Sequence, residues 1–274
     1  MILVTGAAGT LGGALCRELT RRNETVIGLD VNEIDLYRLS QEIPITPIVD
    51  SITRPELWDY LQNEYDIKTV YNCAAIKHVA TVEQHSQWAE LVNAYSIWYM
   101  ADQVRPWKLV HISTDKAVKP SNKYGVSKLR GEVDALDLSA IVIRLVNIHG
   151  SRGCAEEFFA KQIAAGGPVT ARDPRMERFY TTLDQAVSDI LEIAQHGTPG
   201  LYLPDPGEPV MIDDLIAQMI EDRTPNLLTH GNPKIEVVYT GRQKGEKFCE
   251  DILNDDEQLE ETWSKRIHRV VSKP

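Results

Sequence analysis

The sequence predicts an α/β fold with an open, doubly wound parallel sheet, and two patterns in its first half predict it. Short apolar runs alternate with amphipathic stretches up to about residue 146. A glycine-rich loop directly follows the first apolar run and opens the first amphipathic stretch. Strands separated by helices form βαβ units, which give a parallel sheet with helices on both faces. A ligand is then expected at the carboxyl ends of the strands.

Each element of the first half is predicted from its local pattern. Residues 1–5 form a short buried strand, and leucines recur on one face of the helix over 11–22. Pro47 weakens the strand over 45–50, because proline lacks a backbone donor. The predicted strands are 1–5, 25–30, 45–50, 68–75, 108–114 and 140–146. The predicted helices are 11–22, 33–42, 54–64, 83–103 and the stretch that carries Tyr124 and Lys128.

After about residue 150 the alternation loosens, and a smaller α+β annex packed over the sheet edge is predicted. A turn, GSRG at 150–153, separates it from the first half. The predicted helices are 155–165, 183–196, 210–222 and an acidic terminal helix over 254–268. The predicted strands are 168–171, 178–182, 200–203 and 235–239.

Composition and charge restrict the classes of function. Hydrophobic residues make up 43% of the chain and charged residues 25%, which is ordinary for a soluble globular protein. The net charge of −11 argues against binding to nucleic acid or to a membrane surface. No apolar run reaches the roughly 18 residues of a spanning helix, and no signal peptide is evident. The scattered cysteines predict neither a metal site nor disulfides, and hence a cytoplasmic location.

The glycine loop TGAAGTLG, residues 5–12, has the spacing of a phosphate-binding turn. Gly6 permits the tight turn, Gly9 lets the backbone approach a pyrophosphate, and Gly12 allows close packing of helix and strand. An ordinary turn between strand and helix is the alternative. Because the loop lies between a strand and a helix, it predicts a dinucleotide and a Rossmann-type fold. The dinucleotide-binding domain is placed at 1–150, with later strands possible, and a substrate-binding region at 151–274.

Acidic residues follow the second and third predicted strands. Asp30 is placed to accept hydrogen bonds from the adenosine ribose hydroxyls, and it would repel a 2′-phosphate. NAD is therefore favoured, and NADP remains possible. Asp50 is placed to meet the adenine edge, although it can equally cap the helix that follows. The predicted cofactor-binding residues are Gly6, Gly9, Thr10, Leu11, Gly12, Asp30, Asp50, Ser51, Ala74, Ala75 and Lys128.

A tyrosine and a lysine, Tyr124 and Lys128, lie one helical turn apart after the strand that ends at Thr114. A tyrosine with its ordinary pKa of about 10 is a poor base at neutral pH. A nearby ammonium group favours the phenolate and lowers that pKa. Lys128 can also reach the nicotinamide ribose, and Thr114 can orient a substrate alcohol. Such a pair alone is typical of a solvated helix face, but with the glycine loop it predicts redox chemistry on an alcohol.

Asp115 and Lys116 directly follow Thr114 and place an acid beside a base. Side by side, the two groups pair strongly and titrate as a unit. A structural ion pair is the alternative. The oxidation of an alcohol by Tyr124 and Lys128 has no need of this second acid and base. The sequence does not order the two roles.

Further motifs extend the pattern beyond these residues. The short ones are TGAAGTLG, NCAA (72–75), ST (113–114) and Tyr124-x-x-x-Lys128. The longer ones are AAIKHVATVE (74–83), STDKAVKPSNKYGVSK (113–128), RLVNIHGSRG (144–153), RFYTTLDQAV (178–187) and GRQKGEKFCEDIL (241–253). With these motifs the chain resembles the extended short-chain dehydrogenase/reductases, and among them the nucleotide-sugar 4,6-dehydratases of polysaccharide biosynthesis, notably the UDP-N-acetylglucosamine branch. The resemblance covers residue 1 to about 253.

The resemblance implies a role for each catalytic candidate. Tyr124 would take the proton of the sugar 4-hydroxyl while C4 loses hydride to the nicotinamide. Lys116 would remove the C5 proton, and Asp115 would protonate the departing 6-hydroxyl. The return of the hydride to C6 implies a tightly bound cofactor that is regenerated in each cycle. Thr114 and Lys128 complete the implied catalytic set.

The resemblance also implies a set of basic and polar substrate-binding residues. Arg178 and Arg242 match positions that hold a nucleotide diphosphate, for which a guanidinium offers a bidentate fork. Asn147 and Arg152 follow the sixth strand, and Lys77 follows the fourth. Each alone is more typical of a surface residue. As a set on matching motifs they predict a nucleotide-sugar site.

Several other functions remain open from the sequence. A 4-epimerase on the same sugar needs Tyr124, Lys128 and the cofactor but no elimination. A 5,6-dehydratase or a 5-epimerase is also open. A cofactor-binding sensor needs the glycine loop but has no use for Thr114, Asp115, Tyr124 and Lys128 together.

Four aromatic residues on one predicted helix bear on the assembly of the chain. Trp88, Tyr95, Trp98 and Tyr99 lie on the predicted helix 83–103. They indicate either an oligomer face or core, and the resembled family pairs through helices in this region. A homo-oligomer is therefore predicted.

Overall fold

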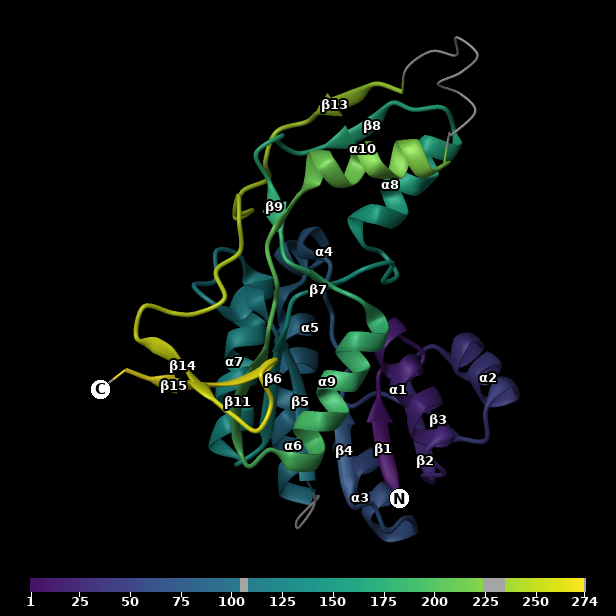
Figure 1. Ribbon diagram of the computed structural model, residues 1–274. Helices are drawn as coiled ribbons and strands as arrows, with labels where there is room; N and C mark the ends of the chain where they lie inside the picture. Colours follow the sequence, from purple (N-terminus) through teal and green to yellow (C-terminus); the bar gives the residue numbers. More distant parts are fainter. Residues whose placement is uncertain (104–107, 224–234, 274) are drawn as a thin grey trace. The chain divides into compact units, whose positions relative to one another are not determined.

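A computed structural model describes residues 1–103, 108–223 and 235–273. The chain divides into two compact units, and each comes from separate stretches of sequence (Figure 1). Unit 1 comprises Met1–Leu145, Leu183–Asp205 and Asp251–Pro274. Unit 2 comprises Val146–Thr182 and Pro206–Glu250. Two later stretches, Leu183–Asp205 and Asp251–Pro274, return to unit 1, and such a contribution of later strands was left open by the predicted division at residue 150.

Unit 1 is built on a largely parallel sheet, which confirms the predicted fold class. Its described strands are β1 (Ile2–Thr5), β2 (Val26–Asp30), β3 (Thr46–Val49), β4 (Thr69–Asn72), β5 (Lys108–Thr114), β6 (Ile141–Leu145), β11 (Gly200–Pro204), β14 (Glu257–Glu261) and β15 (Ile267–Ser272). Their order is β14-β15-β11-β6-β5-β4-β1-β2-β3. The pairs from β11 to β3 are parallel, so these strands end at one common edge.

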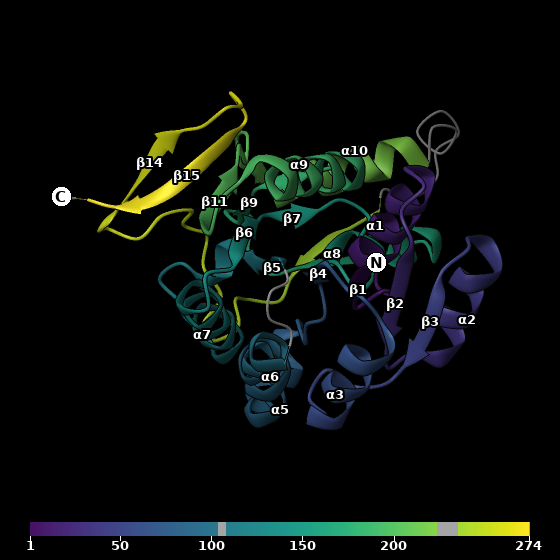
Figure 2. The same ribbon diagram turned by 90° about the horizontal axis from the view of Figure 1, so that it is seen from below.

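Helices cover both faces of this sheet. The helices α1 and α9 pack against each other on one face, and α3, α6 and α7 lie on the opposite face (Figure 2). Leu15 and Leu19 of α1 are buried as predicted, whereas Leu11 is only half-buried. The bounds are α1 (Thr10–Arg21), α2 (Glu33–Glu42), α3 (Pro55–Glu64), α4 (Val79–Gln84), α5 (Ser86–Glu90), α6 (Ser96–Gln103), α7 (Lys123–Asp137) and α9 (Leu183–His196).

The expected terminal helix over 254–268 is wrong. This segment instead forms the antiparallel strands β14 and β15, and β15 pairs with β11. A buried ion pair explains the placement, because Arg144 of β6 donates from Nη1 to Glu257 of β14 at 2.7 Å. Arg144 also binds Glu132 of α7 through two nitrogens. The acidic residues that suggested a solvated helix therefore include a partner for a buried arginine.

The expected long helix over 83–103 is also corrected. It is divided into α4, α5, a π-helical turn η1 (Leu91–Tyr95) and α6. The break falls at His85, whose φ of −131° and ψ of 51° are not helical. In the π-helical turn, the Asn93 side chain donates to and accepts from the backbone of Ile76 at 2.9 Å. A tertiary contact therefore outweighs the continuous helical pattern.

Unit 2 is a small α+β unit with its own core. Its described elements are β7 (Asn147–Ile148), α8 (Ala155–Ala164), β8 (Val169–Ala171), β9 (Glu177–Arg178), β10 (Tyr180–Thr181), β12 (Val210–Met211), α10 (Ile212–Arg223) and β13 (Val237–Tyr239). They pair as β10 with β7, β12 with β9 and β13 with β8. The core contains Phe159 and Ile163 of α8, Val169 of β8 and Ile216 of α10.

Candidate active site

The glycine loop lies at the edge of the sheet where β1 ends. A side chain at Gly6 is excluded, since its φ is +66° and a Cβ would lie 2.8 Å from the backbone nitrogen of Ala74. A Cβ at Gly12 would lie 2.2 Å from the carbonyl oxygen of Gly6. The helix α1 begins at Thr10, and its N-cap residue is Gly9, which has no side chain to cap the helix. The N-terminus of α1 therefore lies beside an exposed glycine, an arrangement that suits a phosphate.

Two of the predicted acidic residues follow the neighbouring strands. Asp30 ends β2 and accepts hydrogen bonds from the backbone nitrogens of Ala8 (3.0 Å) and Asn32 (2.9 Å). Each carboxylate oxygen keeps a further lone pair for a ligand hydroxyl. Asp50 forms an ion pair with Arg54 at 3.0 Å, which was not predicted from the sequence.

The remaining predicted cofactor residues surround this edge. Leu11 follows Thr10 in the first turn of α1. The backbone nitrogen of Ser51 donates to the Asp50 carboxylate at 2.7 Å. Ala74 and Ala75 follow β4, and the Ala74 nitrogen donates to the Thr5 hydroxyl at 3.2 Å. The donors, the glycine loop and the acidic residues thus fit a dinucleotide.

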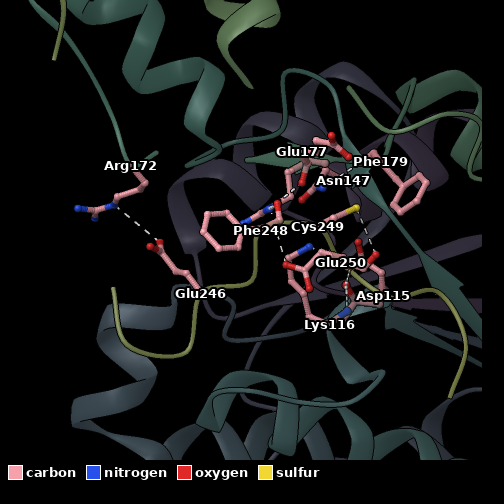
Figure 3. A network of polar contacts seen from close by, with 12 residues as sticks. Asp115, Lys116, Asn147, Arg172, Glu177, Phe179, Glu246, Phe248, Cys249 and Glu250 are labelled. Carbon is pink, nitrogen blue, oxygen red and sulfur yellow. Dashed lines mark hydrogen bonds and ion pairs between the residues drawn. The ribbon is translucent and has the colours of Figure 1, made fainter. Parts of the chain in front are cut away.

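An acid and a base lie side by side where β5 ends. The Asp115 side chain is fully buried, and its Oδ1 accepts a hydrogen bond from Thr114 Oγ1 at 2.8 Å. The same oxygen accepts from Lys116 Nζ at 2.8 Å (Figure 3). Its Oδ2 is buried and has no hydrogen-bond partner among the described residues. Lys116 keeps 23% of its side chain exposed. A buried carboxylate with one unsatisfied oxygen is costly, so a ligand hydroxyl at this place is favoured.

The predicted tyrosine and lysine lie on the first turns of α7. Asn122 caps the helix and accepts from the Gly125 nitrogen at 2.9 Å. Tyr124 and Lys128 are both buried, and Lys128 Nζ donates to the carbonyl of Ile112 in β5 at 2.6 Å. Tyr124 packs against the segment after β4. The structure therefore brings Tyr124 and Lys128 to the same edge of the sheet as Thr114.

Close contact between α7 and the Asp115–Lys116 turn depends on Gly125, which was not predicted as a site residue. A Cβ at Gly125 would lie 2.4 Å from the carbonyl oxygen of Lys116. The sequence contains one indication of this contact: Gly125 follows Tyr124 inside a predicted helix, where glycine is otherwise unfavourable. Gly125 therefore sets how closely Tyr124 approaches the acid–base pair.

We expect Gly125→Ala to lower both stability and any activity of the site. Alanine ordinarily stabilises a helix by about 1 kcal/mol relative to glycine. Here the added Cβ must displace α7 from the Lys116 backbone, so we expect a net loss of about 1–3 kcal/mol in unfolding free energy. Urea unfolding measures it, with Val126→Ala on the exposed face of α7 as the control. A stabilised Gly125→Ala protein would contradict the packing argument.

The environment of Lys128 lowers its pKa to about 8, because burial removes water from the ammonium group, while Glu132 opposes the shift. Nearby, Asn72 donates to His111 Nδ1 at 3.0 Å, and Thr5 donates to Asn72 at 2.7 Å. Burial, followed by the charge of Lys128, holds the pKa of His111 well below its usual range. Lys128 therefore carries the positive charge of this buried region, while His111 is neutral.

The lowered pKa of Lys128 predicts how stability depends on pH. Lys128 binds its proton less tightly in the folded chain than in the unfolded one, whose ordinary pKa is 10.5. Between pH 8 and 10.5 the unfolded chain therefore binds more protons, and stability rises with pH. Relative to Lys128→Met, the wild type should gain about 3 kcal/mol of unfolding free energy over this range. A difference that stays constant with pH would show that Lys128 has an ordinary pKa.

The predicted substrate-binding residues divide between the two units. Lys77 follows β4 in unit 1 and is exposed. Asn147, Arg152, Arg178 and Arg242 belong to unit 2. Arg178 donates from Nη1 to the carbonyls of Glu177 (2.7 Å) and Phe248 (2.9 Å). Asn147 donates to the carbonyl of Phe179 at 2.9 Å, and Arg152 is exposed.

The arginines of unit 2 form a basic cluster with acidic neighbours. Arg172 lies 3.7 Å from Glu246, and Figure 3 shows the two side chains directed toward each other. Arg178 lies 3.7 Å from Glu250. Arg242 lies over the ring of Phe248, with 3.8 Å between the guanidinium carbon and the ring centroid. Phe248 was not among the predicted site residues. The sequence offered only one indication of its role, namely that an apolar residue lies there between charged ones.

Among the described residues, no three His, Cys, Asp or Glu side chains come together in a way that suits a metal ion. In the same part of the chain, no helix has the length and apolarity needed to cross a membrane.

The sheet order, the glycine loop and the tyrosine–lysine pair on α7 define the class of an extended short-chain dehydrogenase/reductase. More narrowly, the chain belongs to the family described as polysaccharide biosynthesis protein, whose model matches residues 2–272. The capsular polysaccharide biosynthesis protein CapD of Staphylococcus aureus is 31% identical over 290 residues. The alignment covers 98% of this chain and 47% of CapD, so the chain spans about half the length of that relative. A UDP-glucose 4-epimerase of Rickettsia rickettsii is 25% identical, with 98% of this chain and 82% of the relative covered.

Solved structures share the fold over nearly the whole chain. Pen from Bacillus thuringiensis matches with a TM-score of 0.89 and 24% identity, covering 100% of this chain and 87% of that chain. DesIV from Streptomyces venezuelae, a dTDP-glucose 4,6-dehydratase with NAD and TYD bound, matches with a TM-score of 0.76. Its identity is 19%, with 92% of this chain and 87% of that chain covered. These likenesses confirm the Rossmann-type fold, and CapD agrees with the family that the motifs indicated.

Proposed function

We propose that this protein is a nucleotide-sugar 4,6-dehydratase that converts a UDP-N-acetylhexosamine into its 4-keto-6-deoxy derivative. The single observation that carries the proposal is the acid–base pair at the end of β5. Asp115 is fully buried against Lys116 and Thr114, and one of its oxygens has no hydrogen-bond partner among the described residues. Elimination of water needs an acid and a base in one place.

The proposed roles follow from the chemistry of each side chain. Tyr124 takes the proton from the 4-hydroxyl, and the Lys128 cation stabilises the phenolate. Oxidation at C4 acidifies the proton at C5, which Lys116 removes in its neutral form. Asp115 protonates the 6-hydroxyl, which leaves as water. When the hydride returns to C6, Lys116 in its protonated form gives a proton back to C5. The atoms then balance, because the product lacks one water and carries the former C4 hydrogen on C6.

NAD is the proposed cofactor. The glycine loop, the first turn of α1 and Asp30 would hold its pyrophosphate and ribose, and Asp30 disfavours a 2′-phosphate. When bound, NAD would supply a hydride acceptor at C4 and a hydride donor at C6. DesIV, which shares the fold, contains NAD.

A nucleotide diphosphate is the proposed anionic part of the substrate. Arg178 and Arg242 of unit 2 would bind it through guanidinium forks. Asn147, Arg152 and Lys77 would contact phosphate or sugar. Supporting observations are the exposed guanidinium group of Arg242 and its stacking on Phe248. The UDP-N-acetylglucosamine assignment rests on the motif resemblance.

A 4-epimerase is the second candidate, and the similarity to a UDP-glucose 4-epimerase favours it. That reaction would use Tyr124 and Lys128 in the same way. It would leave the Asp115–Lys116 pair without a chemical role.

A mass spectrum of UDP-N-acetylglucosamine after incubation with the protein and catalytic NAD tests the proposal. A product lighter by one water supports the dehydratase. An unchanged mass with the galacto isomer present would instead establish the epimerase. If neither product forms, the substrate assignment is wrong, and other nucleotide sugars are then compared by their protection of the protein against heat.

A cytoplasmic location and a homo-oligomeric assembly are also proposed. The described cysteines are free thiols, as suits a reducing cytoplasm. Trp88 and Trp98 are 60% and 45% exposed, which suits association with a second copy of the chain. Sedimentation velocity tests this assembly, and a purely monomeric protein at micromolar concentration would argue against it.

A further inference from the structure

An aromatic residue of unit 2 contacts several arginines at once. Phe248 is half-buried and packs partly against the core of its unit. The guanidinium carbons of Arg242 and Arg175 lie 3.8 Å and 4.5 Å from the centroid of its ring. Its carbonyl accepts hydrogen bonds from the Glu177 nitrogen (2.8 Å) and from Arg178 (2.9 Å). Phe248 thus links three guanidinium groups.

Arg242 differs from its neighbours in its charge balance. The neighbouring arginines pair with carboxylates as Arg172–Glu246, Arg175–Asp173 and Arg178–Glu250. Among the residues that the structure describes, Arg242 makes no ion pair. Its Nη1 donates to the Glu246 carbonyl (2.8 Å), its guanidinium group stacks on Phe248, and its charge acts, after that of Arg175, on the Asp173 carboxylate. Most of its N–H donors therefore remain available to an anion.

Backbone hydrogen bonds fix the segment that carries both residues. The nitrogens of Thr240 and Gly241 donate to the carbonyls of Ala171 and Arg172, each at 2.9 Å. At the other end, the carbonyl of Phe248 is held by Glu177. The ring therefore has a fixed place, whereas the long side chain of Arg242 has several rotatable bonds and is exposed. A guanidinium stacked on an aromatic face keeps one plane and directs its fork outward.

We propose that Phe248 is a positioning residue, whose ring holds the guanidinium of Arg242 ready to bind the diphosphate of a nucleotide ligand. This inference rests on the proposed function, because it assigns the diphosphate to Arg242. The contribution of Phe248 passes through Arg242. Replacement of Phe248 should therefore weaken the binding of the phosphates and leave the recognition of the nucleoside unchanged.

Calorimetric titration with UDP and with uridine tests the role without turnover. Phe248→Leu removes the ring but keeps an apolar side chain, and we expect it to weaken UDP binding about 3- to 10-fold. Its affinity for uridine should equal that of the wild type. Phe248→Tyr keeps the ring face and should restore UDP affinity. Phe248→Met serves as a second ring-free variant if Phe248→Leu does not fold.

A double variant separates positioning from a general structural role. We expect Arg242→Gln to weaken UDP binding at least as much as Phe248→Leu. The Phe248→Leu/Arg242→Gln protein should bind no worse than Arg242→Gln alone, because the ring acts through Arg242. Equal losses for UDP and uridine, or additive losses in the double variant, would overturn the inference. A wild-type protein that binds no nucleoside diphosphate would instead overturn the proposed function.

Discussion

We expect Tyr124→Phe to lose at least about 10³-fold in turnover while it still binds NAD with its original affinity. Removal of the phenol oxygen removes the proposed base for the sugar 4-hydroxyl. The ring itself is retained, so the packing against Val79 and Val82 should stay intact. Turnover is measured by mass spectrometry and NAD binding by fluorescence titration.

The control for this variant is Tyr37→Phe, because Tyr37 is a largely exposed tyrosine on α2. It should retain full activity. A Tyr124→Phe protein with wild-type turnover would remove Tyr124 from the proposed redox step. A loss of NAD binding in that variant would place the effect in the cofactor site.

We expect Lys116→Ala to block elimination and to lower product formation about 10²- to 10⁴-fold. Because Lys116 is the proposed base at C5, the variant should still oxidise C4. Absorbance of reduced nicotinamide should then build up in a single turnover, without loss of water from the sugar.

Lys119→Gln provides the matched control, since Lys119 lies three residues further on and pairs with the exposed Asp255. It should form product at the wild-type rate. Release of a 4-keto-6-deoxy sugar by Lys116→Ala at the normal rate would show that another group is the base. Loss of C4 oxidation as well would indicate that Lys116 shapes the pocket and does not act at C5 alone.

Much of the fold was predictable, because the hydrophobic period is regular along the first half of the chain and along single elements of the second half. The strand over 108–114 and the helix over 183–196 were predicted with the bounds that the structure shows. Wrong predictions arose where a distant contact outweighed the local pattern. Glu257 joins a strand because it meets the buried Arg144, and Asn93 sits in a π-helical turn where it meets Ile76. The partners of such contacts are far apart in sequence.

Only part of the candidate site was predictable from the sequence. The parallel order of the strands brings Thr5, Asp30, Asn72 and Thr114 to one edge of the sheet, as the alternation of strands and helices implies. The importance of Gly125 was not predictable, because it depends on the distance between α7 and another backbone segment. The same holds for Phe248, whose partners Arg175 and Arg178 come from another stretch of the chain.

The position of a deuterium label tests the central claim most directly. UDP-N-acetylglucosamine that carries deuterium at C4 is incubated in ordinary water with the protein and catalytic NAD, and NMR locates the label in the product. The proposed dehydratase predicts one deuterium at C6 of a 4-keto-6-deoxy sugar, because the hydrogen lost from C4 returns within the same active site. Deuterium found at C4 of an epimerised sugar, or a deoxy product without deuterium at C6, would contradict the account.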